Sequence, residues 1–170
     1  MADTVHSSLG EQLENTLQGR VCLMGVGNTD YGDDGFGVYL AQSLLDAGVQ
    51  DVVIAGSSPE HWMGVTADRE FDHLVFLDAV DLSAQTEPGS VIFLDSEQIA
   101  ARYPQVSTHK LSLGLLAKFA ESNGITKAWL LGVQPGSLKG AQTLTPAVSK
   151  TSGVLLELLF RLKTREETVC

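Results

Sequence analysis

Two aspartates and one histidine are the residues whose types and spacing best fit a metal site. Asp34 lies in a glycine-rich loop, Asp78 follows an apolar run at 73–77, and His109 lies within 107–113. Two carboxylates and one imidazole suit a divalent ion that keeps open positions for a substrate. The cysteines do not have the spacing of a zinc knuckle, so we do not expect a structural zinc cluster.

The loop at 25–37, GVGNTDYGDDGFG, begins like a dinucleotide-binding turn. The GxGxxG pattern fails because Asp30 occupies the third glycine position, and the three carboxylates of the loop would repel a pyrophosphate. A cation suits this loop better, and its glycines let a backbone approach closely. We expect Asp33 to cap the next helix or favour its dipole. For Asp34 we do not, because a cap alone does not explain the surrounding glycines.

Asp78 is expected at the edge of the core, where a carboxylate loses solvation. It follows four apolar residues and therefore needs a cation or several hydrogen-bond donors nearby. Capping of its own loop is the alternative that remains open. Asp81 lies farther out, and we expect water to solvate it. His109 alone would not indicate a metal, but it is predicted at the same sheet edge as the two carboxylates.

The elements that position these residues alternate between strands and helices. Apolar runs predict strands, and apolar residues four apart predict helices. Predicted strands occupy 20–25, 51–55, 73–77, 90–94 and 128–133, and predicted helices occupy 33–48, 59–68, 108–122 and 145–163, with a short N-terminal helix within 1–18. The link before 90–94 shows no helical periodicity, so we expect that strand to be antiparallel. We predict one domain over 1–170, an α/β sandwich around a mostly parallel sheet.

Ligands of open α/β sheets bind beyond the carboxyl ends of the strands. We therefore expect the substrate to contact the loops after the first two strands, through Gly27, Asn28, Gly56 and Glu60. Glu60 has the alternative role of capping its own helix. A Ser–His or Cys–His nucleophile pair is not recognisable in the sequence, because Cys22 lies inside an apolar run and Cys170 is the last residue.

Composition narrows the class of protein. The chain has 170 residues, of which 44% are hydrophobic and 19% charged, so a compact fold is expected. A net charge of −10 argues against binding to nucleic acid or to an anionic membrane. The N-terminus lacks the apolar core of a secretory signal, and no apolar run is long enough to cross a membrane. We expect a cytoplasmic protein.

Six segments of the chain resemble the nickel–iron hydrogenase maturation endopeptidases. The N-terminal signature of that family is similar to residues 25–37. The resemblance continues, in the family's order and spacing, through AGSSPEH at 55–61, DHLVFLDAVD at 72–81, STHKLSL at 107–113, LLGVQPGSL at 130–138 and LTPAVSK at 144–150. The segments span nearly all of the chain after residue 20.

The resemblance implies a three-layer α/β/α sandwich with a five-stranded twisted sheet. It also implies an endopeptidase that removes a C-terminal extension from the precursor of a hydrogenase large subunit after nickel insertion. The family's metal-contacting positions fall on Asp34, Asp78 and His109 of this chain. The implied metal is nickel supplied by the substrate, and other divalent ions can occupy the site in the free enzyme.

One departure from the family leaves the catalytic step open. Many members carry an aspartate just before the glycine of the second loop, where this chain has Ile54-Ala55-Gly56. Metal-assisted hydrolysis and an aspartic mechanism, in which Asp34 and Asp78 share a proton, both remain open. The rivals from other classes are a non-catalytic chaperone that checks the nickel of the precursor and a metal-dependent hydrolase of small molecules.

Overall fold

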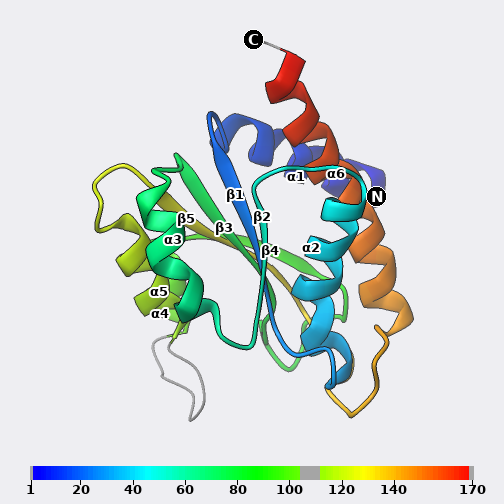
Figure 1. The fold of residues 1–170 in the computed structure, drawn as a ribbon. Helices are drawn as coiled ribbons and strands as arrows, with labels where there is room; N and C mark the ends of the chain where they lie inside the picture. The colour runs from blue at the N-terminus through cyan, green and yellow to red at the C-terminus, as the bar shows by residue number, and fades with distance from the viewer. Residues whose placement is uncertain (1, 104–111, 169–170) are drawn as a thin grey trace.

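The computed structural model describes residues 2–103 and 112–168, which form a five-stranded sheet between two layers of helices (Figure 1). The sheet order is β2-β1-β3-β5-β4. The strands β2, β1, β3 and β5 pair in parallel, and β4 is antiparallel to β5. This arrangement confirms the predicted, mostly parallel sheet with one antiparallel strand. The strands are β1 Val21–Val26, β2 Val52–Gly56, β3 His73–Ala79, β4 Val91–Asp95 and β5 Lys127–Val133.

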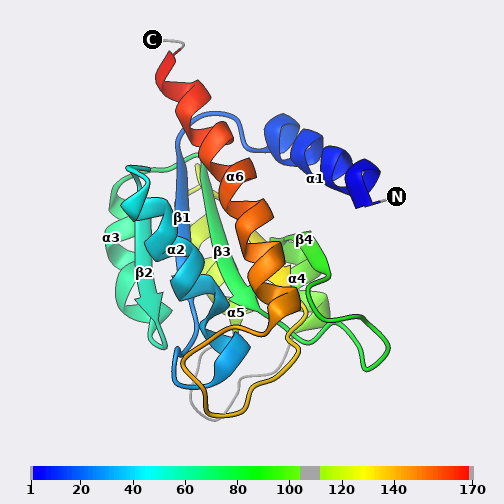
Figure 2. The same ribbon diagram turned by 90° about the vertical axis from the view of Figure 1, so that its right-hand side faces the viewer.

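Helices cover both faces of the sheet, with α1, α2 and α6 on one face and α3, α4 and α5 on the other (Figures 1 and 2). The α-helices are α1 Ala2–Thr16, α2 Phe36–Asp46, α3 Met63–Asp68, α4 Ser96–Arg102, α5 Leu113–Glu121 and α6 Pro146–Thr168. Two 3-10 turns, η1 Gly32–Gly35 and η2 Pro59–Trp62, precede α2 and α3. Among the described helices, none is long and apolar enough to span a membrane.

Three helix predictions need correction. The helix predicted from residue 33 begins as the 3-10 turn η1, and α2 follows it. The helix predicted over 108–122 begins at Leu113, because the Ser112 side chain caps it by accepting from the Leu115 N–H at 3.2 Å. Residues 104–111 lie outside the described part of the chain. The helix α4 was not predicted.

Each sheet face carries its own hydrophobic core. All six residues of β1 are buried, as a strand that is covered on both faces requires. On one face Leu23 packs in a cluster with the α2 residues Phe36 and Leu40. On the other face Met24 and Phe76 belong to a second cluster. The strands are thus held rigidly between two cores, and the loops at their carboxyl ends have a fixed base.

The first turn of α2 packs directly on the carboxyl ends of β1 and β3. A Cβ at Gly25 would lie 2.3 Å from the Gly37 carbonyl oxygen. A Cβ at Gly37 would lie 1.9 Å from the Leu77 carbonyl oxygen. Only glycine allows such an approach of two backbones. This packing brings η1, which carries Asp34, next to the end of β3.

The connections that leave β1 and β2 cross opposite faces of the sheet. α2 follows β1 on one face, and α3 follows β2 on the other (Figure 2). The chain therefore changes face between β1 and β3, which are neighbours in the sheet. Such a switch point leaves a crevice beyond the strand ends where α/β proteins bind ligands.

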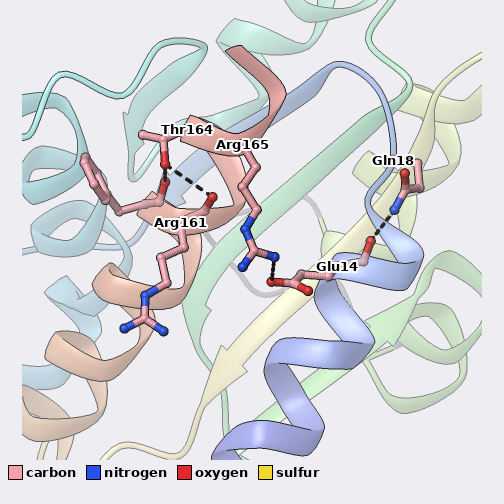
Figure 3. A network of polar contacts seen from close by, with 6 residues as sticks. Glu14, Gln18, Arg161, Thr164 and Arg165 are labelled. Atoms are coloured by element: carbon pink, nitrogen blue, oxygen red, sulfur yellow. Dashed lines mark hydrogen bonds and ion pairs between the residues drawn. The ribbon is translucent and has the colours of Figure 1, made fainter. Parts of the chain in front are cut away.

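At the opposite end of the strands, α1 packs against α6. Leu13 and Leu17 of the N-terminal segment are buried in the core that α6 shares. Arg165 donates to the Glu14 carboxylate at 2.7 Å, and Gln18 donates to the Glu14 carbonyl oxygen (Figure 3). The predicted N-terminal helix is therefore present and covers part of the sheet.

Candidate functional site

Gly27 lies between the backbone of Asp34 and the side chain of Asp78. A Cβ at this position would lie 1.8 Å from the Asp34 carbonyl oxygen and 3.7 Å from the Asp78 Oδ1. The Gly27 φ of 134° is also one that L side chains rarely adopt. Its N–H donates to the Gly56 carbonyl oxygen at 2.9 Å. The loops after β1 and β2 and the end of β3 therefore converge on this glycine.

Asp34 is fixed by its own loop and does not cap a helix. The Asn28 N–H donates to Asp34 Oδ2 at 2.9 Å. Gly35 is the N-cap of α2, and no side chain makes a capping hydrogen bond there. Asn28 in turn accepts from the Asp30 N–H at 2.9 Å, so its side chain shapes the loop. The expectation that Asp34 has a role other than capping is thus consistent with its contacts.

Asp78 lies near the carboxyl end of β3 and is 8% exposed, as predicted for a carboxylate at the edge of the core. Tyr103, which the sequence analysis did not single out, contacts the loop that follows Asp78. Its hydroxyl donates to the Asp81 carbonyl oxygen at 3.1 Å. Burial raises the pKa of Tyr103, and the charges of Asp81 and Asp78 add to that rise while Arg102 opposes it.

His109, the third predicted ligand, lies outside the described residues. Within residues 2–103 and 112–168, no three His, Cys, Asp or Glu side chains gather closely enough to hold a metal ion. The described part of the chain places the backbone of Asp34 and the side chain of Asp78 around Gly27. The complete three-residue site stays a prediction.

Asp33 has a role that the sequence analysis did not predict. Its buried carboxylate accepts four hydrogen bonds, from the Thr145 N–H and hydroxyl at 2.7 Å each, the Gly136 N–H at 2.7 Å and the Ser137 N–H at 3.1 Å. Burial alone would raise the pKa of Asp33, but these hydrogen bonds outweigh it and hold the pKa below its ordinary value. No capping hydrogen bond from Asp33 is observed at η1 or α2. This carboxylate instead fastens the loop after β5 to the loop after β1.

We call residues 28–35, after β1, and residues 136–145, after β5, the paired loops. Further backbone and side-chain hydrogen bonds join them. The Gly32 N–H donates to the Ala141 carbonyl oxygen at 2.7 Å, and the Asp33 N–H donates to that of Ser137 at 3.0 Å. Gln142 donates to the Asp30 carboxylate at 3.1 Å. The loop that carries Asp34 is therefore braced from the loop after β5 (Figure 2).

Gln134 braces the loop after β3 in a similar way and was also missed. Its side chain is buried, its Oε1 accepts from the Leu82 N–H at 2.7 Å, and its Nε2 donates to Asp81 Oδ1 at 3.3 Å. Asp81, predicted to be only solvated, is thus part of a bonded loop. A usable signal existed, because Gln134 follows an apolar strand directly, as Asp78 does.

Glu60 lies in η2, directly beyond β2. Its Oε1 is 4.0 Å from His61 Nε2. Its Oε2 is buried and accepts no hydrogen bond from any residue that the structure describes. No side chain caps η2 in that part of the chain, so the capping alternative for Glu60 is not observed. Its predicted contact with substrate stays a prediction.

Cys22 does not qualify as a nucleophile. It is fully buried in β1. Burial, reinforced by the charge of Asp51, raises the pKa of the thiol to about 12. The reactive form of cysteine is the thiolate, which is scarce at neutral pH for such a group. Cys170 lies outside the described residues.

Comparisons of the amino-acid sequence agree with this picture of the fold. The family model described as "Hydrogenase maturation protease" matches residues 38–161, which include Asp78 and His109 and begin after Asp34. The hydrogenase 2 maturation protease of Escherichia coli is 29% identical over 136 residues, covering 76% of this chain and 81% of that protein. The hydrogenase 3 maturation protease of the same organism is 31% identical over 115 residues, covering 66% and 71%.

Solved structures show the same architecture. A NiFe hydrogenase maturation protease, HycI, from Thermococcus kodakarensis superposes with a TM-score of 0.78 at 30% identity, covering 90% of this chain and 99% of that one. The hydrogenase maturating endopeptidase HybD of Escherichia coli superposes with a TM-score of 0.67 at 28% identity, covering 82% and 89%. The three-layer sandwich expected from the sequence is therefore confirmed.

Proposed function

Because this chain belongs to the hydrogenase maturation protease family, we propose that it removes a C-terminal extension from the precursor of a nickel–iron hydrogenase large subunit after nickel insertion. One observation supports the proposal above the others, namely that the Asp34 backbone and the Asp78 carboxylate both lie at Gly27, where the loop after β1 meets the end of β3. Two carboxylates at a switch point between parallel strands form an acidic site that suits a bound cation.

In this proposal the nickel ion is part of the substrate. Asp34, Asp78 and His109 bind the nickel of the folded precursor, and the imidazole supplies the ligand type that suits nickel best. An empty precursor would then lack the group that the site binds. The specificity for nickel-loaded precursor comes from the affinity of these side chains for the metal.

The scissile peptide lies beside the metal, against the glycines of the first two loops. Gly27 and Gly56 allow its backbone to come close, while Asn28 and Glu60 supply polar groups. Two catalytic steps fit these residues. In one, the substrate's nickel polarises the scissile carbonyl or a water molecule. In the other, Asp34 and Asp78 share a proton and activate water as a carboxylate pair.

The pH dependence of cleavage separates the two catalytic steps. A carboxylate pair needs one protonated member, so its rate falls as the pH rises through the higher of the two pKa values. A metal-bound water instead becomes more reactive as it loses its proton, so the rate rises with pH. The measurement is single-turnover cleavage of saturating precursor across a pH series.

The proposal is tested by incubating the protein with nickel-loaded precursor and following the precursor's mass. We expect a mass loss equal to the C-terminal extension. We expect Asp34→Asn, Asp78→Asn and His109→Ala each to lower the cleavage rate roughly 100-fold or more. The matched control is Asp46→Asn, which removes an exposed carboxylate at the far end of α2 and should cleave at the wild-type rate.

Three outcomes would contradict the proposal in different ways. Wild-type rates in all three site variants would show that the chosen site is wrong. Stable binding of the precursor without any mass loss would identify a chaperone. Turnover of generic peptides or esters without a hydrogenase precursor would identify a small-molecule hydrolase.

A further inference from the structure

Two large apolar side chains are exposed on the paired loops, beside the candidate site. Tyr31 is 54% exposed, and Leu138 is 52% exposed. Tyr31 precedes Asp34 in the same loop, and Leu138 follows Ser137, whose N–H donates to the buried Asp33 carboxylate. A Cβ at Gly32 would lie 2.7 Å from the Ser137 carbonyl oxygen and 3.1 Å from that of Lys139. The backbones that carry the two apolar residues are therefore in contact.

The loops that carry these side chains are held far more firmly than a connection needs. A loop that only joins β5 to α6 can run over the surface with its polar groups in water. Here a fully buried carboxylate, Asp33, binds three residues of that loop, and Tyr39 adds a bond to the Gln142 carbonyl oxygen at 2.8 Å. A loop backbone held in this way loses little conformational freedom when its side chains enter an interface.

We propose that Tyr31 and Leu138 form a docking surface for the folded hydrogenase large-subunit precursor. This inference rests on the proposed function and adds the residues by which the enzyme recognises its protein substrate at a distance from the cleaved bond. Binding energy from such remote contacts positions the reacting groups without taking part in the chemistry.

The composition of this surface fits a protein partner. Protein interfaces place rigid aromatic and aliphatic anchors at the centre and polar groups around them. Tyr31 and Leu138 are such anchors, and their sequence neighbours Asp30 and Lys139 are exposed and carry opposite charges. The surface also continues into the candidate site through Asp34, so one folded precursor can contact both at once.

The test measures the affinity of nickel-loaded precursor for the full-length protein together with its cleavage rate. Tyr31→Ala and Leu138→Ala should each weaken binding roughly tenfold, and the double variant more. Cleavage at saturating precursor should change far less than affinity, because neither side chain touches the reacting atoms. Leu138→Met, which keeps the apolar volume, should restore most of the affinity lost in Leu138→Ala.

The matched control is Phe119→Ala on α5. Phe119 is 51% exposed, close to the 54% of Tyr31 and the 52% of Leu138, but its helix lies in the layer on the other face of the sheet. It should leave affinity unchanged. Thermal unfolding of each variant checks the fold, and exposed substitutions of this kind should move stability by less than about 1 kcal/mol.

Affinities within twofold of wild type for both alanine variants would overturn the docking surface, as would an equal loss in Phe119→Ala. Binding by the wild type without cleavage would refute the proposed protease function, while the variant affinities would still decide the docking surface. A wild-type protein that does not bind the precursor would overturn both.

Discussion

Replacing Asp33 with asparagine tests the connection between the paired loops. The carboxylate accepts three hydrogen bonds at Oδ2 and one at Oδ1. An asparagine whose oxygen takes the place of Oδ2 keeps three donors, but its amide group must then face the Thr145 N–H. One buried N–H is left without an acceptor, and the remaining bonds lose their charge.

A hydrogen bond to a charged group contributes about 1.5–3 kcal/mol, and a buried donor without a partner costs about 1–3 kcal/mol. We therefore expect Asp33→Asn to lower the free energy of unfolding by about 3 kcal/mol. The measurement is the urea midpoint at constant m-value. The control is Asp30→Asn in the same loop, where an exposed carboxylate accepts from Gln142 and the expected loss is below about 1 kcal/mol.

The wild type and Asp33→Asn also give a second, independent test, through the pH dependence of their free energies of unfolding. The folded pKa of Asp33 is lowered, so the folded state binds the proton less readily than the unfolded state. The stability that Asp33 contributes is therefore complete above its unfolded pKa of about 4 and is lost as the pH falls through the folded pKa. The difference between wild type and Asp33→Asn should shrink in acid. A loss below 1 kcal/mol at neutral pH, or a difference that does not shrink in acid, would refute the reasoning.

Four further substitutions or modifications have expected outcomes. Gly27→Ala should lower the free energy of unfolding by more than about 2 kcal/mol, because the Gly27 φ is positive and a Cβ there would clash with the Asp34 carbonyl oxygen. Gly153→Ala in α6, where a Cβ would meet open space, should be neutral or stabilising. Urea unfolding measures both. The Cys22 thiol, in a variant lacking the other cysteine, should react with a thiol reagent at least 100-fold more slowly in the native than in the unfolded protein. Gln134→Leu should cost about 1–2 kcal/mol and slow precursor cleavage, because the loop beside Asp78 loses two hydrogen bonds. Burial lowers the folded pKa of His73, so the stability that His73 contributes should fall as the pH drops below about 6.5, and His73→Phe should flatten the profile of urea midpoints between about pH 7.5 and pH 5.5.

The sheet was largely predictable because its strands are apolar on both sides. A continuous run such as 73–77 needs two covering layers, and the absence of a helical link before 90–94 indicated the antiparallel β4. The helix α4 was not predicted because Ile99 is its one bulky apolar residue, so the helix shows no apolar periodicity. Its capping box, formed by Asp95 and Gln98, was a signal that could have revealed it. The start of α5 was placed too early because several residues before Leu113 are of capping type.

The residues of the candidate site also differ in how far the local sequence pattern could identify them. The burial of Asp78 was predictable because this carboxylate follows an apolar strand, and Asp34 was singled out because of the glycines around it. Their role as metal ligands stays a prediction. The bracing role of Asp33 was missed because its hydrogen-bond donors lie 103 to 112 positions away, and the local sequence pattern carries no information about them. Gln134 obeyed the rule that found Asp78, so that omission was avoidable.

The long separation between Asp33 and its donors also bears on how the chain matures during synthesis. Contacts between distant segments form late, because closing a long loop costs entropy before the contact stabilises anything. A growing chain that ends before Thr145 lacks two of the hydrogen-bond donors that offset the cost of burying the Asp33 carboxylate. The loop bearing Asp34 therefore takes its final shape only after the strand β5 and the start of α6 have been made.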